Sequence, residues 1–390
     1  KSLYRALSLA MFSVSLGFCI VNPFLPIYIR STGADGFSIA LIFSGYSLAK
    51  VVFPPFLGAW SDLRGRRIFL LVGLAIYTLV SLGYLLMPDR LVMLLFLRFA
   101  QGIGAALFLP LARAFVGRIA PRNQEGTMLG TFEVSFYAAL ALGPLLGGLI
   151  KDRFGFLGIF SALFILSLLS LWVALLTFSG FAEPYRSFRE RTDYRRAIRS
   201  RTLQGLLCFI LTRAFGIILL SIFLPIVMNS MLKFSNIQIG MVMAVGPGLT
   251  ALLLRPLGEL SDRADRKCLI LIGGGTAALL TFFLPWAERF WQLLILSGSI
   301  GFFSALSLPA SSALLIQEGG RYGMGLTVGF FNSVMETGFL IAPFLGGILI
   351  DAFGSSFVFY AGGLFGCLGT VAFMVLCPDG KVMLPPAGFL

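Results

Sequence analysis

Residues 58–67 read GAWSDLRGRR and residues 258–267 read GELSDRADRK, two versions of one segment. The surrounding sequence repeats as well, because Pro26 and Pro225, and likewise Pro110 and Pro309, lie 199 positions apart. The segments 143-GPLLGG-148 and 342-APFLGG-347 keep the same offset between their prolines. An internal repeat of this length predicts a fold built from two similar halves.

The composition places both halves in a membrane. Of 390 residues, 58% are hydrophobic and 12% are charged, whereas a soluble domain has roughly 25% charged residues. Runs of about 20 apolar residues, long enough to cross a bilayer, occur near 7–29, 38–60, 68–87, 91–116, 127–150, 157–180, 203–229, 237–258, 268–287, 290–316, 324–349 and 357–377. We therefore predict an all-α membrane protein of twelve spans, with a six-helix bundle in residues 1–180, a basic linker in 181–202 and a second bundle in 203–390.

Lysine and arginine gather in the loops on one side of these spans, including seven arginines in the linker. The positive-inside rule then places both termini in the cytoplasm. The net charge of +13 reflects this topology and contact with anionic lipid headgroups, so no nucleic-acid partner is expected. Two interpretations of the linker remain, an amphipathic helix on the membrane surface and a flexible tether.

Residue types that carry chemistry are scarce. The five cysteines lack metal or redox spacing and the chain has no histidine, which removes the commonest catalytic base. Neither a nucleophile motif nor a phosphate-binding loop is present. The sequence therefore predicts no enzyme activity, no metal site and no cofactor.

Two six-helix halves with GAWSDLRGRR between the second and third spans resemble the major facilitator superfamily over essentially the whole chain. Residues 98-RFAQGIGAA-106 resemble the family's arginine-containing helix-4 motif. Gly143, Pro144, Gly147 and Gly148 resemble the helix-5 motif of its drug:proton antiporters. The resemblance implies a monomeric secondary transporter of the bacterial cytoplasmic membrane, which works by alternating access and uses a proton gradient as its energy source.

The repeated loops are predicted to form a cytoplasmic gate. An aspartate among bases can accept charge-assisted hydrogen bonds from a facing helix start, or pair with a nearby arginine. For Asp62 the candidate partners are Arg66 and Arg113. The predicted gate residues are Gly58, Asp62, Gly65, Arg66, Arg113, Asp262 and Arg266. Alternatively, the loops only set the topology through their arginines.

Ionisable residues inside the spans are the candidates for a functional site, because charges in a membrane are costly. Glu336 is the first candidate proton carrier and Glu133 the second, with Arg98 tuning a carboxyl group. Alternatively, each forms a fixed ion pair or packing contact between helices. The predicted substrate-cavity residues are Asn22, Lys50, Arg98, Arg213 and Glu336.

The first span departs from the drug-antiporter pattern. Many members carry an acidic residue there, whereas residues 7–29 contain Asn22 and no acid. The deep charges are three bases, Lys50, Arg98 and Arg213, against two acids, Glu133 and Glu336. This surplus favours neutral, zwitterionic or anionic amphiphiles as substrates.

The sequence thus predicts a proton-coupled exporter of small amphiphilic organic compounds, with the substrate and the membrane lipids as its partners. A lipid or lysolipid flippase and a siderophore or metabolite exporter of the same fold remain as alternatives. A third alternative, from a different class, is a membrane-embedded sensor or scaffold that transports no substrate.

Overall fold

The computed structural model describes residues 2–64, 66–86, 90–119, 125–178 and 194–377, and every regular element in these ranges is helical. The N-terminal half comprises α1 (Ser2–Val21), α2 (Leu25–Ser31), α3 (Gly36–Arg64), α4 (Arg66–Leu86), α5 (Leu91–Ile119) and α6 (Glu125–Phe178). The C-terminal half comprises α7 (Tyr194–Arg199), α8 (Arg201–Ser230), α9 (Asn236–Arg263), α10 (Arg266–Phe282), the 3₁₀ helix η1 (Leu284–Trp286), α11 (Phe290–Tyr322), α12 (Met324–Phe353) and α13 (Ser355–Leu376).

Ten helical segments of the described chain are long and apolar enough to cross a membrane. One of them, residues 132–177, belongs to α6, which is 54 residues long and is interrupted at Gly155, where φ is 65°. Glycine adopts this positive φ without a steric penalty, so α6 provides two spans. With α10, an apolar helix of 17 residues, the described chain accounts for the twelve predicted spans.

The structure corrects the first predicted span, residues 7–29, which is not one helix. α1 ends at Val21, and α2 begins at Leu25 after a turn. Pro23 and Pro26 both lack an N–H donor, so two regular helical hydrogen bonds are missing within about one turn of this segment. The equivalent α8 contains only Pro225 and continues unbroken. The turn is tolerated inside a membrane bundle because it is buried in protein, as the fully buried Phe24 shows.

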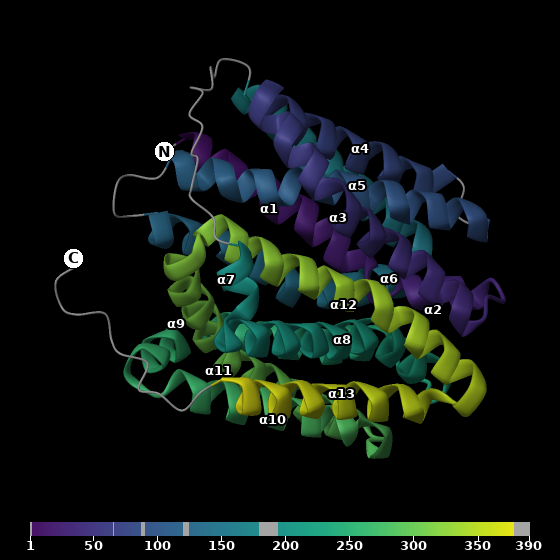
Figure 1. Cartoon of the computed structure of the whole chain (residues 1–390). Helices are drawn as coiled ribbons and strands as arrows, with labels where there is room; N and C mark the ends of the chain where they lie inside the picture. The colour runs from purple at the N-terminus through teal and green to yellow at the C-terminus, as the bar shows by residue number, and fades with distance from the viewer. Residues whose placement is uncertain (1, 65, 87–89, 120–124, 179–193, 378–390) are drawn as a thin grey trace.

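Equivalent helices pack in equivalent ways in the two halves. α5 lies against α3 and α4, as α11 lies against α9 and α10. α1 lies along α6, as α8 lies along α12 and α13. The halves meet where α3 contacts α12 and where α6 contacts α9. The start of α1 and the end of α13 lie at one end of the molecule (Figure 1). We call this end the terminus side, and the opposite end, where α3 begins, the far side.

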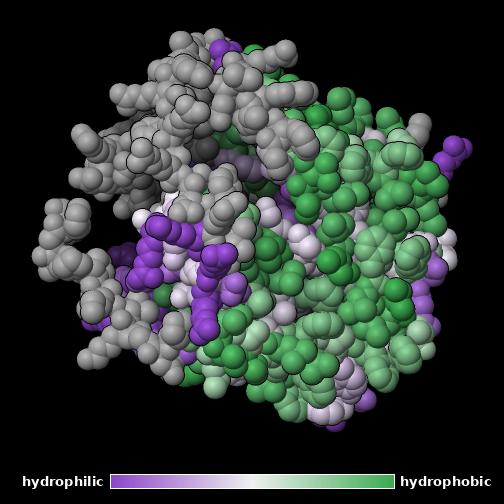
Figure 2. Space-filling model, in the orientation of Figure 1, coloured by the Kyte–Doolittle hydropathy of each residue, from purple (hydrophilic) through white to green (hydrophobic). Residues whose placement is uncertain are grey.

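The outer surface is largely apolar, and Figure 2 shows hydrophobic residues over a wide continuous area. Large apolar side chains such as Leu79, Leu252 and Trp291 are exposed there. A soluble protein rarely exposes such a surface, whereas a bilayer solvates it. The described residues therefore form an integral membrane protein.

Part of the basic linker is ordered against the C-terminal half. α7 lies within the predicted 181–202 segment, and its Ala197 is buried in a small apolar cluster with Leu203, Leu315 and Leu326. Arg196 and Arg199 remain exposed. Residues 181–193 lie outside the described residues, so the structure does not decide between the two interpretations of that part of the linker.

Candidate functional site

Lys50 of α3 and Glu336 of α12 form an ion pair that joins the two halves. The two side chains are only 18% and 11% exposed. The Glu336 Oε1 atom accepts the hydrogen bond from Lys50, while Oε2 is buried and has no hydrogen-bond partner within the described residues. Since an unpartnered buried carboxylate oxygen is costly, Oε2 is a position where a proton or a substrate donor group can bind.

Arg98 of α5 lies next to this pair and is 2% exposed. Its Nη1 atom donates to Gln101 Oε1 at 2.7 Å, and its Nη2 atom donates to Asn22 Oδ1 at 3.1 Å. Asn22 belongs to the turn between α1 and α2, so the break in the first span supplies a ligand to Arg98. The sequence repeat could not show this contact, because α8 has no such break.

Aromatic rings connect Arg98 to the ion pair. The Arg98 guanidinium carbon lies 5.4, 4.7 and 5.6 Å from the ring centres of Phe18, Phe43 and Tyr46. The Tyr46 ring is also 5.4 Å from Lys50 Nζ. Four of the five predicted cavity residues, Asn22, Lys50, Arg98 and Glu336, therefore lie in one continuous cluster, which we call the central cluster.

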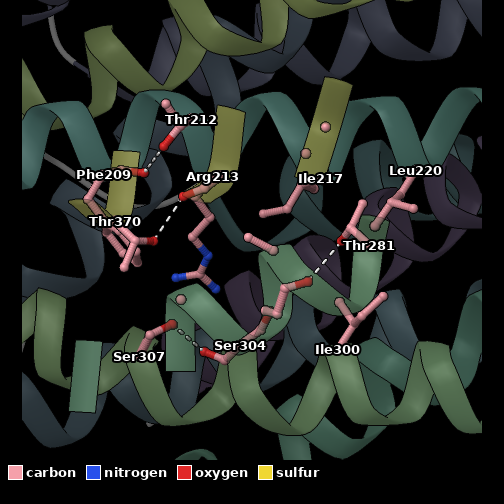
Figure 3. Close-up of a pocket in the computed structure, with 16 residues that line it drawn as sticks. Phe209, Thr212, Arg213, Ile217, Leu220, Thr281, Ile300, Ser304, Ser307 and Thr370 are labelled. Atoms are coloured by element: carbon pink, nitrogen blue, oxygen red, sulfur yellow. Dashed lines mark hydrogen bonds between the residues drawn. The ribbon is translucent and has the colours of Figure 1, made fainter. Parts of the chain in front are cut away.

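The fifth predicted cavity residue, Arg213, lies elsewhere. It lines a pocket inside the C-terminal half, between α8, α10, α11 and α13 (Figure 3). The prediction that it shares one cavity with Lys50 and Glu336 is therefore not met by this conformation.

Glu133, the second candidate proton carrier, is held by a base of its own half. Arg113 Nε and Nη2 donate to its two carboxylate oxygens at 2.6 and 3.2 Å. Two-point pairs of this kind between arginine and a carboxylate are among the stronger hydrogen-bonded contacts in proteins. Arg113 was predicted to serve the gate, and here it binds Glu133 in the same half. The fixed ion pair was the alternative interpretation of Glu133.

The predicted gate makes no described contact between the halves. Asp262 is 74% exposed and faces Arg266 of the following helix, with Oδ1 and Nη2 3.7 Å apart. Such an exposed pair contributes little to stability. Residue 65 and the side chains of Asp62 and Arg66 lie outside the described part of the structure, and for Gly58 only its place in α3 is described, so the gate prediction remains untested for the first copy.

The helix-5 motif packs α6 against two neighbours. A Cβ atom at Gly143 would overlap Cys19 of α1, and one at Gly147 would lie 2.8 Å from a Phe24 ring carbon. On the other side, a Cβ atom at Gly148 would overlap the Asn236 carbonyl oxygen of α9, and one at Gly240 would overlap that of Pro144. Small residues here allow the helix backbones to approach closely. The contact between α6 and α9 lies between the two halves.

Two aspartates close the far side, and neither was predicted. Asp351 of α12 accepts hydrogen bonds from the backbone N–H groups of Gly36 and Phe37, at 3.0 and 3.1 Å. These groups open α3, which belongs to the other half. An acidic side chain at a helix start satisfies free N–H donors and the positive end of the helix dipole.

Asp152 makes the equivalent contact at the second interface. It accepts from the Asn236 side chain at 2.7 Å and from the Ile237 backbone N–H at 3.2 Å, at the start of α9. Asp152 and Asp351 are 199 positions apart, which is the offset of the repeated prolines. This spacing was the signal in the sequence that could have identified them.

The contacts between α3 and α12 run in antiparallel register from the far side inward. After the Gly36–Asp351 bond comes the Ser44 hydroxyl, which donates to the Leu340 carbonyl oxygen at 2.8 Å, and then Lys50–Glu336. At about 1.5 Å per residue, Lys50 lies roughly 21 Å along α3 from Gly36. Of these contacts, the ion pair therefore lies farthest from the far side, while Ser44, roughly 12 Å along α3, lies nearest the middle of a hydrocarbon core about 30 Å thick.

Two similar helical bundles that meet through two helix pairs, with a buried charge cluster between them, are the architecture of a membrane transporter. The chain belongs to the Major Facilitator Superfamily, whose profile matches residues 7–287 and 205–387. It is a transporter and not an enzyme.

Relatives and solved structures agree with this assignment. Over 370 residues the chain is 30% identical to the multidrug resistance protein MdtG of Salmonella arizonae and 29% identical to that of Salmonella typhimurium, with 90% of this chain and 89% of each relative covered. It also resembles a bacterial homologue of the human lysosomal transporter Spinster in an inward-facing conformation (TM-score 0.78, 15% identity, 96% of both chains). A further structure, the nucleoside transporter NupG, has a TM-score of 0.76 at 13% identity, over 96% of this chain and 99% of that one. At such identities the two structures establish the fold alone.

Proposed function

We propose that this transporter exports small amphiphilic organic compounds in exchange for protons, by alternating access. The name of the MdtG relatives, multidrug resistance protein, supports export of organic compounds. The proton step rests on a single observation, the buried Lys50–Glu336 ion pair between the halves.

The pair couples the protonation of Glu336 to the position of the halves. With the far side closed, Lys50 lies beside Glu336, and a neighbouring cation favours an ionised carboxylate. When α3 and α12 separate, Glu336 loses this cation and its protonated form becomes favoured. Glu336 therefore releases its proton when the far side is closed and takes one up when the far side is open.

The direction of exchange follows from the orientation of the chain. We assign the terminus side to the cytoplasm because the basic loops lie on it. Glu336 then loads a proton from outside and releases it inside, while the substrate moves the opposite way. A proton gradient supplies the free energy, and a single copy of the chain in the cytoplasmic membrane carries both gating interfaces.

The charges of the central cluster also restrict which substrates can bind there. α1 and α2 contain no acidic residue, and the carboxylate of Glu336 is already neutralised by Lys50. A substrate that carries a negative or zwitterionic polar group can replace Glu336 at Lys50, which opens the far side with the substrate bound. The rings of Phe18, Phe43 and Tyr46 offer apolar contact to the rest of an amphiphile.

The test is transport in proteoliposomes with an imposed pH gradient and a panel of fluorescent amphiphilic dyes. Glu336→Gln keeps the shape of the side chain and abolishes its titration, so we expect gradient-driven transport to disappear. Glu259→Gln is the matched control, because Glu259 is a 65% exposed acid of the same half. Undiminished gradient-driven transport by Glu336→Gln would refute the proton role. Movement of labelled lysolipid but of no dye would favour the flippase alternative.

A further inference from the structure

The pocket around Arg213 lies wholly inside the C-terminal half and has a volume of about 50 Å³. This exceeds the space that one water molecule needs, and it matches a small ion or the polar end of a larger molecule. Hydroxyl groups line it from four helices, namely those of Thr212, Thr281, Ser304, Ser307 and Thr370. No acidic side chain of the described residues lines it.

The Arg213 guanidinium points into this pocket, toward Ser304 and Ser307 (Figure 3). Its Nη1 atom is buried and makes no hydrogen bond within the described chain. Arginine stays protonated in proteins, and an unpaired charge inside a membrane bundle is costly. The other deep bases have partners: Lys50 binds Glu336, and Arg98 binds Asn22 and Gln101.

The hydroxyl groups are available to a ligand without loss of helix structure. Thr281 and Thr370 donate to carbonyl oxygens of their own helices, at 2.9 Å in both cases, and Ser307 does so at 3.1 Å. These carbonyl groups lie within helices, where they also accept regular backbone hydrogen bonds. The hydroxyl groups nearest the guanidinium, those of Ser304 and Ser307 (Figure 3), can therefore rotate toward a bound anion, and the site then offers a fixed cation beside neutral donors.

We propose that Arg213 and these hydroxyl groups bind a singly charged anionic group, either a free halide ion or the carboxylate of a substrate. Arg213 as a whole is partly exposed, so a larger molecule that carries the anionic group can keep its apolar part outside the pocket. Only the link to a substrate rests on the proposed export function; anion binding itself does not.

The experiment measures anion binding to the purified full chain by thermal unfolding, with sodium bromide or sodium benzoate titrated at constant ionic strength against sodium sulfate. We expect saturable stabilisation of the wild type. Arg213→Met should weaken binding by about tenfold or more, since hydrogen bonds to a charged group contribute about 1.5–3 kcal/mol. Arg255→Met is the matched control, because Arg255 is 92% exposed on α9.

A second variant guards against misfolding of Arg213→Met. A Cβ atom at Gly216 would have its nearest neighbour 3.9 Å away, so Gly216→Ala adds a methyl group to the pocket wall without a clash. It should weaken benzoate binding more than bromide binding. Bromide binding alone identifies a free halide as the ligand, and benzoate binding alone identifies a substrate carboxylate.

Absence of saturable stabilisation by both anions would overturn the proposal, as would unchanged binding in Arg213→Met and Gly216→Ala. The outcome is independent of the proton step. If Glu336→Gln transports normally while Arg213→Met loses anion binding, the antiport proposal fails and the anion site stands.

Discussion

Asp351→Ala should shift the transporter toward states with an open far side. The substitution removes the carboxylate that accepts two backbone N–H groups of α3, from Gly36 and Phe37, across the interface between the halves. Loss of an N-terminal cap costs about 0.5–2 kcal/mol, and a favourable charge at a helix start contributes about 0.3–1 kcal/mol. Because Asp351 is exposed, we take about 1 kcal/mol, which changes the equilibrium between the two states about fivefold.

The double variant Asp152→Ala/Asp351→Ala provides a quantitative check. The two caps act on different helices, and effects at separate sites usually add. The expected shift is therefore about 2 kcal/mol, or about 30-fold. Such a change converts a population that is mainly closed on the far side into one that is mainly open.

Distances between spin labels across the far side measure this equilibrium. Leu157→Cys and Phe357→Cys place one label in each half, at side chains that are 63% and 48% exposed. The native cysteines are replaced by alanine in this background. We expect the longer-distance population to grow from the wild type to the single variant and further in the double variant.

Asp35→Ala is the matched control, because Asp35 caps the same helix from its own half. Its carboxylate accepts from the Ser38 backbone N–H at 2.8 Å, and this contact does not change when the halves separate. The control should leave the distance distribution unchanged. The reasoning is refuted if Asp35→Ala and Asp351→Ala shift the distribution equally, or if neither shifts it.

Four further predictions concern packing and charge. Lys50→Met should lower the free energy of unfolding by about 3–5 kcal/mol, since it leaves a buried carboxylate unpaired. In thermal unfolding, the double variant Lys50→Met/Glu336→Gln should recover much of this loss. Arg98→Lys should also be destabilising, because one ammonium group cannot reproduce the planar contacts to both Asn22 and Gln101; equal melting temperatures would contradict this. Gly148→Ala should open the far side in the same label assay, as its Cβ atom overlaps Asn236, whereas Gly320→Ala, which meets nothing within 4 Å, should not. Hydrogen bonds from Ser38 hold the pKa of the Asp35 carboxyl group below its ordinary 3.8. The stabilising effect of Asp35 is therefore present above pH 3.8 and is lost as the pH falls through the lower pKa of the folded state. The difference in melting temperature between Asp35→Ala and the wild type should accordingly disappear in acid.

The arrangement of the spans was predictable because a membrane imposes a local rule. Each helix needs about 20 apolar residues whatever its neighbours are, so hydropathy and the repeated prolines were sufficient to infer the helices and their grouping. The break at Asn22 was missed, although Pro23 and Pro26 were visible. Proline alone does not decide between a kink and a break, as the intact α8 with Pro225 shows.

The partners of the charged residues were not predictable from the same information. Lys50 and Glu336 are 286 positions apart, and no periodicity connects them. Glu133 was the second candidate proton carrier, and only the packing of α5 against α6 shows that Arg113 lies against both of its oxygens. Asp152 and Asp351 had the repeat offset, but nothing along the chain shows that the starts of α9 and α3 lie against them.

The sequence by itself determined a membrane fold of two related halves and the small set of buried charges that a transporter can use. Tertiary structure decided which charges neutralise each other and which remain available, because an ion pair depends on atoms a few ångströms apart on different helices. It joined Lys50 to Glu336 between the halves, and in a pocket lined by hydroxyl groups it left the Nη1 atom of Arg213 without a hydrogen-bond partner among the described residues. Those distances follow from how the helices pack, which the order of residues along any one helix does not contain.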